Sequence, residues 1–300
     1  REFTELQGTM GGIYAREEGL PEDVWKAIYF HYLPIGVESD AAPAKGPLGR
    51  AAVTWAAVSL ADKLDTIVGL FAAGEKPTGS RDPYGLRRAA QGVVKILADM
   101  PARQSLVDLV DEAAKAFGDR PPVNPQWREA VFAFLGEREA HLFERRGYRS
   151  DEARAVAPHW SNPHLALKRI DAVQKSRASA DFEALAVLVK RVNNITKGFQ
   201  KTAGTDALKG RLTEPAEIAL ADEMGRRWPA IESALGDARY ADAMKEVANF
   251  RAPVDRFFTD VMVMTEDPGL REARLTLLAT MRDGVLQIAD IAQIAPEETK

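Results

Sequence analysis

The sequence contains no cysteine among its 300 residues. Disulfide bonds and thiolate chemistry are therefore excluded, and the composition fits a reducing compartment. No apolar run is long enough to span a bilayer, and no signal peptide is visible. We therefore expect a soluble, cytoplasmic protein with no membrane partner.

Common catalytic motifs are missing as well. There is no GxxxxGK(S/T) phosphate loop, no glycine-rich dinucleotide fingerprint and no GxSxG elbow. Histidine is scarce, and with no cysteine available His141, His159 and His164 suggest no triad. We predict that the chain alone holds no catalytic residue and no cofactor.

Neither sign of charge predominates strongly enough to attract nucleic acid to the whole molecule. The chain has 40 Lys and Arg against 44 Asp and Glu, for a formal net charge of −4. Any contact with RNA must then come from local clusters of basic residues. The length and a hydrophobic content of 46% favour two domains of ordinary size.

Helical periodicity dominates the sequence, and no segment shows a convincing strand pattern. Residues 60–90 predict two amphipathic helices around a polar loop, with apolar residues stepping by four, three and four in each helix. The first helix carries Leu60, Leu64, Ile67 and Phe71, and the second carries Leu86, Ala90, Val93 and Leu97. Asp82 and Pro83 are typical of an N-cap and the first helical position.

Three arginines, Arg81, Arg87 and Arg88, lie in this loop and at the start of the second helix. Arginines beside a helix N-terminus can bind a phosphate group. The alternative is that they are solvated or pair with Asp82 and neighbouring acids, as most surface arginines do.

A second basic segment lies in a helix predicted from Asp181 to about Lys201. Its apolar stripe consists of Leu185, Leu188, Val192, Ile195 and Phe199. The other side carries Lys190, Asn194, Lys197 and Lys201, with Arg191 and Asn193 beside them. Acidic partners at four-residue spacing are missing, so the stripe is not a row of salt bridges. Lys, Arg and Asn suit phosphate and sugar contacts in RNA, and the alternative is an ordinary solvated face.

Further helices are predicted at 1–18, 99–118, 127–146, 214–228, 237–249 and 268–294. The segment DRPPVNPQW at 119–127 stops any helix and marks the clearest boundary in the chain. These patterns together predict an all-α protein with two helical domains.

Several strings resemble the bacterial glycyl-tRNA synthetase β-subunit family. They are EFTELQGTMGGIYA at 2–15, HYLP at 31–34, the segment 60–90 and APVDRFFTDVMVM at 252–264. They occur in the family's order and spacing, and KRVNNI at 190–195 matches a KRxxNI-type signature of the same family. Because the chain opens on Arg1 and the resemblance begins immediately, we expect a C-terminal fragment of a longer protein.

The resemblance implies a division into three parts. It gives a degenerate HD-like helical domain at 1–100, a helical linker region at 101–157 and a helical-bundle, anticodon-binding-like domain at 158–300. It also implies that the partners are tRNA-Gly and a separate α subunit in an α2β2 ligase. ATP, magnesium and glycine would be used by that α subunit. The basic residues of 190–201 and the three arginines at 81–88 are then expected to contact tRNA.

His31, Asp62 and Asp65 resemble the remnant of an HD phosphohydrolase site. That superfamily binds its metal through a His, a His-Asp pair and a later Asp, but His31 is followed by Tyr32. The remaining ligands are too few for a divalent ion, so we predict no metal site. We expect instead that His31 and Asp62 hydrogen-bond across a helix interface. Two alternatives to tRNA binding remain, an active HD phosphohydrolase and a purely structural scaffold for subunit assembly.

Overall fold

A computed structural model shows an entirely helical chain over the residues that it describes, which are 3, 6–36, 42–43, 45–101, 103–118, 122–200, 208 and 210–294. Within these ranges no β-strand occurs, and an isolated bridge joins Thr78 to Arg81. The all-α prediction is therefore confirmed. None of the described helices combines the length and the apolar character needed to cross a membrane.

The chain divides into two compact units. Unit 1 comprises 1–147 together with 160–165, and unit 2 comprises 148–159 together with 166–300. The three-part division at 100 and 157 stays a prediction, because a division by packing does not identify the family of a domain.

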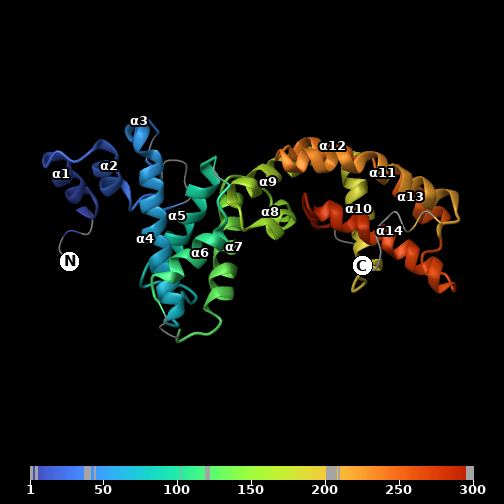
Figure 1. Ribbon diagram of the computed structural model, residues 1–300, viewed down its shortest axis with the longest axis horizontal. Helices are drawn as coiled ribbons and strands as arrows, with labels where there is room; N and C mark the ends of the chain where they lie inside the picture. Colours follow the sequence, from blue (N-terminus) through green and yellow to red (C-terminus); the bar gives the residue numbers. More distant parts are fainter. Residues whose placement is uncertain are drawn as a thin grey trace. The chain divides into compact units, whose positions relative to one another are not determined.

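Unit 1 is organised around one long helix, α4. The helices of this unit are α1 (Thr9–Glu17), α2 (Glu22–Phe30), α3 (Lys45–Leu48), the 3-10 turn η2 (Gly49–Ala51), α4 (Ala52–Ala72), α5 (Leu86–Asp99), α6 (Leu106–Lys115) and α7 (Trp127–Arg145). Helix α4 packs against α2, α5, α6 and α7 (Figure 1). The predicted stripes of α4 and α5 face this core, and only Leu60 among them is half-buried.

The start of α5 differs from the prediction. The helix begins at Leu86 and not at Pro83, because Gly85 adopts a left-handed conformation with φ of 67°. Asp82 nevertheless caps the helix from upstream. Its two carboxylate oxygens accept hydrogen bonds from the backbone amides of Leu86 at 2.8 Å and Arg87 at 3.0 Å.

Glycines bring α1 close to α2. A Cβ atom at Gly12 would lie 2.5 Å from the Cβ of Tyr29, and one at Gly8 would lie 3.0 Å from the carbonyl oxygen of Tyr29. The outer side of α1 leaves Ile13 and Tyr14 exposed. The glycines of this segment therefore serve close helix packing.

Unit 2 surrounds α10 with shorter and longer helices. Its elements are α8 (Ser150–Val156), the turn η3 (Ala157–His159), α9 (Pro163–Arg177, from residue 166 on), α10 (Ala180–Ile195), α11 (Pro215–Gly236), α12 (Tyr240–Ala248), α13 (Arg251–Asp260), α14 (Pro268–Leu286) and the turn η5 (Ile291–Ile294). Helix α10 packs against α12, α13, α14 and η5, and α11 packs against α12, α13 and α14 (Figure 1).

Several predicted boundaries in unit 2 were wrong. Helix α11 continues through Pro229 to Gly236, and α14 stops at Leu286 before the separate turn η5. Pro253 lies within the first turn of α13, where a missing N–H costs no helical hydrogen bond.

Candidate nucleic-acid interface

Helix α10 separates an apolar side from a basic side, as its sequence predicts. Val192 and Leu185 are fully buried, whereas Arg191 and Asn194 are exposed and Lys190 is half-buried. The helix begins after Ser179, two positions earlier than a cap at Asp181 would place it. The burial of one side against α12, α13 and α14 fixes which side is left for a partner.

The end of α10 was mispredicted. The helix stops at Ile195, and Gly198 has φ of 76°, so Lys197 lies in the turn beyond the helix and Lys201 lies outside the described residues. Arg282 of α14 holds this end. Its Nη1 donates to the carbonyl oxygen of Thr196 at 2.9 Å and to the Oγ1 of Thr196 at 3.0 Å. A cation at a helix C-terminus satisfies free carbonyl groups and opposes the helix dipole.

The basic side of α10 forms one wall of a pocket of about 840 Å³ in unit 2. The other walls come from α8, the end of α9 and η5. The pocket is lined by Arg149, Asp151, Arg154, Arg177, Glu183, Lys190, Asn193, Asn194, Ala292, Gln293 and Ile294. Four cations thus face two carboxylates and three amide side chains, in a chain whose net charge is negative.

Two acidic side chains hold Arg177 in this pocket. Its Nη2 lies 2.8 Å from Asp151 Oδ2, and its Nη1 lies 3.6 Å from Glu152 Oε1. Burial alone would raise the pKa of Asp151, but the hydrogen bond and charge of Arg177 outweigh burial and lower this pKa. Asp151 is therefore ionised at neutral pH and keeps Arg177 in place.

The remaining basic residues of the α10 segment do not share this pocket. Arg191 lies over the ring of Phe258 on α13, with its Cζ 4.2 Å from the ring centroid. Lys197 is exposed, and no ion pair of its ammonium group is found among the described residues. Of the predicted contact residues, the structure brings Lys190 and Asn194 together.

The three predicted arginines of unit 1 lie around the start of α5. Arg81 and Arg88 are exposed, while the Nη2 of Arg87 donates to the carbonyl oxygen of Gly79 at 2.7 Å. The first amides of α5 already bind the carboxylate of Asp82. A phosphate at this helix N-terminus would have to compete with that carboxylate.

The expected hydrogen bond between His31 and Asp62 does not form in the described structure. His31 Nδ1 lies 2.7 Å from the carbonyl oxygen of Ile28, and Asp62 and Asp65 are exposed. The interface is crossed instead by Lys63, whose Nζ donates to the carbonyl oxygen of His31. Within the described ranges no group of three or more His, Asp or Glu side chains is arranged to hold a metal, and the prediction of no metal site still requires a direct test.

Comparison with known proteins identifies the family of this chain. The family model described as glycyl-tRNA synthetase beta subunit matches residues 1–158, which is more than half of the chain. The chain belongs to the glycyl-tRNA synthetase β-subunit family. The model described as DALR anticodon binding domain matches residues 186–297, so the pocket wall formed by α10 and η5 lies in an anticodon-binding domain.

Curated relatives of this β-subunit family support the assignment. The glycine–tRNA ligase beta subunit of Vibrio cholerae is 40% identical over 292 residues, which are 97% of this chain and 41% of the relative. That of Leptothrix cholodnii is 40% identical over 295 residues, and these cover 98% and 40% of the two chains. The chain therefore spans about two fifths of the length of the curated relatives it matches.

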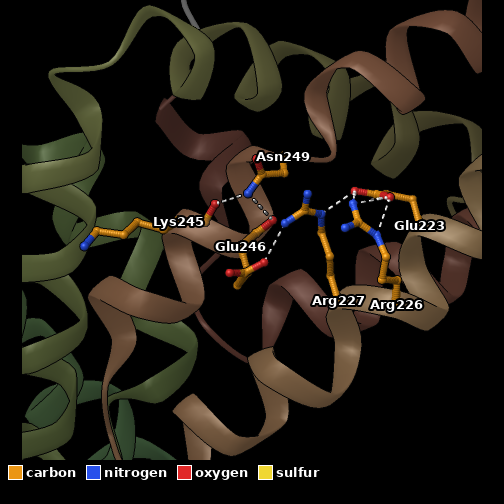
Figure 2. A network of polar contacts seen from close by, with 6 residues as sticks. All are labelled: Glu223, Arg226, Arg227, Lys245, Glu246 and Asn249. Atoms are coloured by element: carbon orange, nitrogen blue, oxygen red, sulfur yellow. Dashed lines mark hydrogen bonds and ion pairs between the residues drawn. The ribbon is translucent and has the colours of Figure 1, made fainter.

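Elsewhere in the anticodon-binding domain of this β-subunit chain, basic residues are neutralised by acids. Figure 2 shows Arg227 of α11 between Glu223 of the same helix and Glu246 of α12. The Nη1 of Arg227 donates to Glu246 Oε2 at 2.7 Å, and Arg226 also binds Glu223. This network joins α11 to α12 and leaves these arginines less suited to bind phosphate than Arg154 of the pocket, for which no ion pair is found among the described residues.

Sequence patterns missed three arginines of the pocket in this β-subunit chain. These residues, Arg149, Arg154 and Arg177, lie outside the basic segment 190–201 in sequence. The acidic residues Asp151 and Glu152 stand between Arg149 and Arg154, so no basic cluster is visible there. No periodic signal distinguishes them, because they contribute to the pocket only through the packing of α8 and α10 against η5.

Proposed function

We propose that this part of the β subunit binds tRNA-Gly and supports its glycylation in the cytoplasm together with a separate α subunit, in an α2β2 ligase. The α subunit would bind ATP, glycine and magnesium, so the chain described here would form no aminoacylation site of its own. Membership in the β-subunit family and the match to an anticodon-binding domain support this proposal.

The observation that carries the proposal is the cationic pocket beside α10. Lys190 and Asn194 belong to the segment that matches the anticodon-binding domain, and Arg149 and Arg154 extend their surface onto α8. Cations and amides together suit the phosphate, sugar and base groups of RNA. The exposed Lys197 would extend the contact beyond the pocket, and Lys201, which lies outside the described residues, belongs to the same proposal.

Salt dependence of tRNA binding tests the proposal. Each phosphate neutralised by a lysine releases condensed counterions, so Lys190→Ala and Lys197→Ala should each lower the slope of log affinity against log salt by roughly 0.7 to 0.9. Lys245→Ala is the matched control, because this exposed lysine of α12 lies 3.9 Å from Asp242 and does not line the pocket. Electrophoretic titrations at two salt concentrations give both the affinity for tRNA and its salt slope.

Asn194→Ala should behave differently from the lysine variants. Its amide is uncharged, so affinity should fall while the salt slope stays nearly constant. If wild type binds tRNA no better than an unrelated acidic protein does, the scaffold alternative becomes the better account. If wild type binds but all lysine variants keep its affinity and slope, the tRNA contact lies elsewhere.

Unit 1 would supply a second, weaker contact through Arg81, Arg87 and Arg88. Arg88→Ala should lower tRNA affinity less than Lys197→Ala does, because Asp82 already occupies the amides of α5.

Two further assays separate the proposal from its enzymatic alternative. Without an α subunit the chain should form no glycyl-tRNA. Elemental analysis of the wild-type chain should find no stoichiometric metal, whereas the phosphohydrolase alternative requires a bound metal that Asp62→Ala removes.

A further inference from the structure

Helix α1 places its small residues, and not its large ones, against its neighbour. Its main neighbour among the described elements is α2, and in Figure 1 it lies on the side of α2 away from α4. Gly8 and Gly12 make this contact, because an added Cβ at either position would meet the backbone of Tyr29. Within α1, Gly12 and Ala15 are the buried residues. The contact between α1 and α2 therefore buries little apolar side-chain surface.

The opposite side of α1 is apolar and exposed. Leu6 lies just before the helix, and the helical period places Met10, Ile13 and Tyr14 together on this side. We call these four residues the outer face of α1. Leu6, Ile13 and Tyr14 are 39%, 40% and 61% exposed. No charged residue occurs from 6 to 15, whereas the solvated side of a surface helix normally carries charged residues.

Exposed apolar side chains are concentrated near this helix. The first 35 residues hold seven of the fifteen large apolar side chains that are exposed in the described part of the chain. Single exposed apolar residues are normal, but an apolar group on one side of one helix is typical of a surface that another protein surface covers. The outer face carries no cation, so it does not suit RNA.

Helix α1 also has little intrinsic stability. It has nine residues, and Gly11 and Gly12 lie in its interior, where glycine is less favourable than any other residue except proline. A helix this short is marginal in water and depends on packing. Because α2 contacts only the small residues of α1, a second neighbour on the outer face would supply most of the apolar burial.

We propose that the outer face of α1 packs against the rest of the β subunit, the part expected before residue 1. The relative from Vibrio cholerae matches over 41% of its length, so about three fifths of that subunit lies outside the matched region. A part of the same chain that joins it next to α1 has a high effective concentration there, so this packing needs no affinity between separate molecules. The uncharged face also fits a permanent interface, which resembles a domain core cut in half.

Hydrogen exchange of the α1 amides at 12–17 tests this inference. It is measured in the 300-residue chain, in the full-length β subunit and in the full-length β subunit with its α subunit. Covering Ile13 and Tyr14 opposes the opening of α1, so exchange should be at least about tenfold slower in the full-length β subunit than in the 300-residue chain. Addition of the α subunit should cause no further slowing. Amides of α4, which lie in the core of unit 1, serve as the internal reference.

Ile13→Gln tests the outer face itself. In the full-length β subunit it should remove most of the slowing at 12–17, because it places an amide in an apolar contact. In the 300-residue chain the same change should leave exchange nearly unaltered, since Ile13 is exposed there. Ile218→Gln is the matched control, because this isoleucine of α11 is 41% exposed and belongs to unit 2. It should not alter exchange at α1 in either protein.

Each other result overturns the inference in its own way. Slowing that appears only with the α subunit would assign the outer face to that subunit. Slowing in the 300-residue chain that grows with its concentration would assign the face to a second copy. Equal exchange in all samples, or slowing that Ile13→Gln leaves intact, would mean that the rest of the β subunit does not cover this face. None of these results bears on tRNA binding, which the salt titrations measure separately.

Discussion

The ammonium group of Lys63 on α4 lies 2.8 Å from the backbone carbonyl oxygen of His31 and 3.2 Å from that of Tyr32, just beyond the end of α2. Ser59 and Trp55 continue this row one and two turns earlier on α4. Trp55 Nε1 donates to the carbonyl oxygen of Phe30, and Ser59 Oγ donates to that of Leu33. Helix α4 thereby caps the C-terminal end of α2 with three side chains spaced by four residues.

Replacing Lys63 by Met should destabilise the protein by roughly 1 to 3 kcal/mol, because the carbonyl groups of His31 and Tyr32 lose their donor. Chemical denaturation measures this change. Lys115→Met is the control: Lys115 is exposed and pairs with Glu112 on the same helix, so its removal should have little effect. Equal stability of both variants would show that the row of donors does not hold α2.

Lys63 also predicts a pH dependence. Burial lowers its pKa from 10.5 to about 8, against the opposing charge of Asp62. Between pH 8 and 10.5 the unfolded chain keeps a proton that the folded protein has released, so the contribution of Lys63 to the free energy of unfolding rises with pH, by at most about 3 kcal/mol. Relative to Lys63→Met, wild type should therefore gain stability over this window. A constant difference would mean that the Lys63 pKa is not lowered.

Gly284 of α14 permits contact with Trp228 of α11, since a Cβ at this position would overlap the indole ring. Gly284→Ala should therefore destabilise unit 2 by roughly 1 to 3 kcal/mol or more through overpacking. Gly225→Ala is the matched helical control, with no atom within 4 Å of an added Cβ. It should stabilise by about 0.5 to 1 kcal/mol through helix propensity, and thermal unfolding compares the two.

Arg274 and Glu217 form a buried ion pair at 2.6 Å, with side-chain exposures of 5% and 0%. Arg274→Met should cost roughly 3 to 5 kcal/mol, since it leaves a buried carboxylate uncompensated. Adding Glu217→Gln should recover part of this loss, because the amide oxygen can still accept from the backbone N–H of Glu214. If the double variant were no more stable than Arg274→Met, charge would not be the reason for the loss.

Two valines of α10 test its orientation. Val192 is fully buried and Val187 is 49% exposed. Val192→Asp should destabilise the domain by several kcal/mol, roughly the effective cost of burying an ion. Val187→Asp should change the free energy of unfolding by only about 0.5 kcal/mol. Urea unfolding followed by circular dichroism measures both changes. If Val187→Asp were the more destabilising variant, α10 would have the opposite orientation.

Local pattern was sufficient to predict the helices and their buried sides. The stripes of α4, α5 and α10 follow from the 3.6-residue period, which relates residues of one helix regardless of the rest of the chain. The family resemblance also came from the sequence, because its strings keep their order and spacing along the chain. Both the helical periodicity and the family resemblance depend only on the order of residues along the chain, so neither requires knowledge of how the helices pack.

The sequence by itself thus determined an all-helical chain with a basic side on α10, while tertiary structure decided where that helix ends and what faces it. Arg282 caps α10 from 86 positions away, and the pocket joins α8 to η5 across more than a hundred residues. Lys63, not Asp62, reaches α2 for the same reason. Periodicity fixes which residues share a face of one helix, but which faces meet depends on the packing of all the helices together.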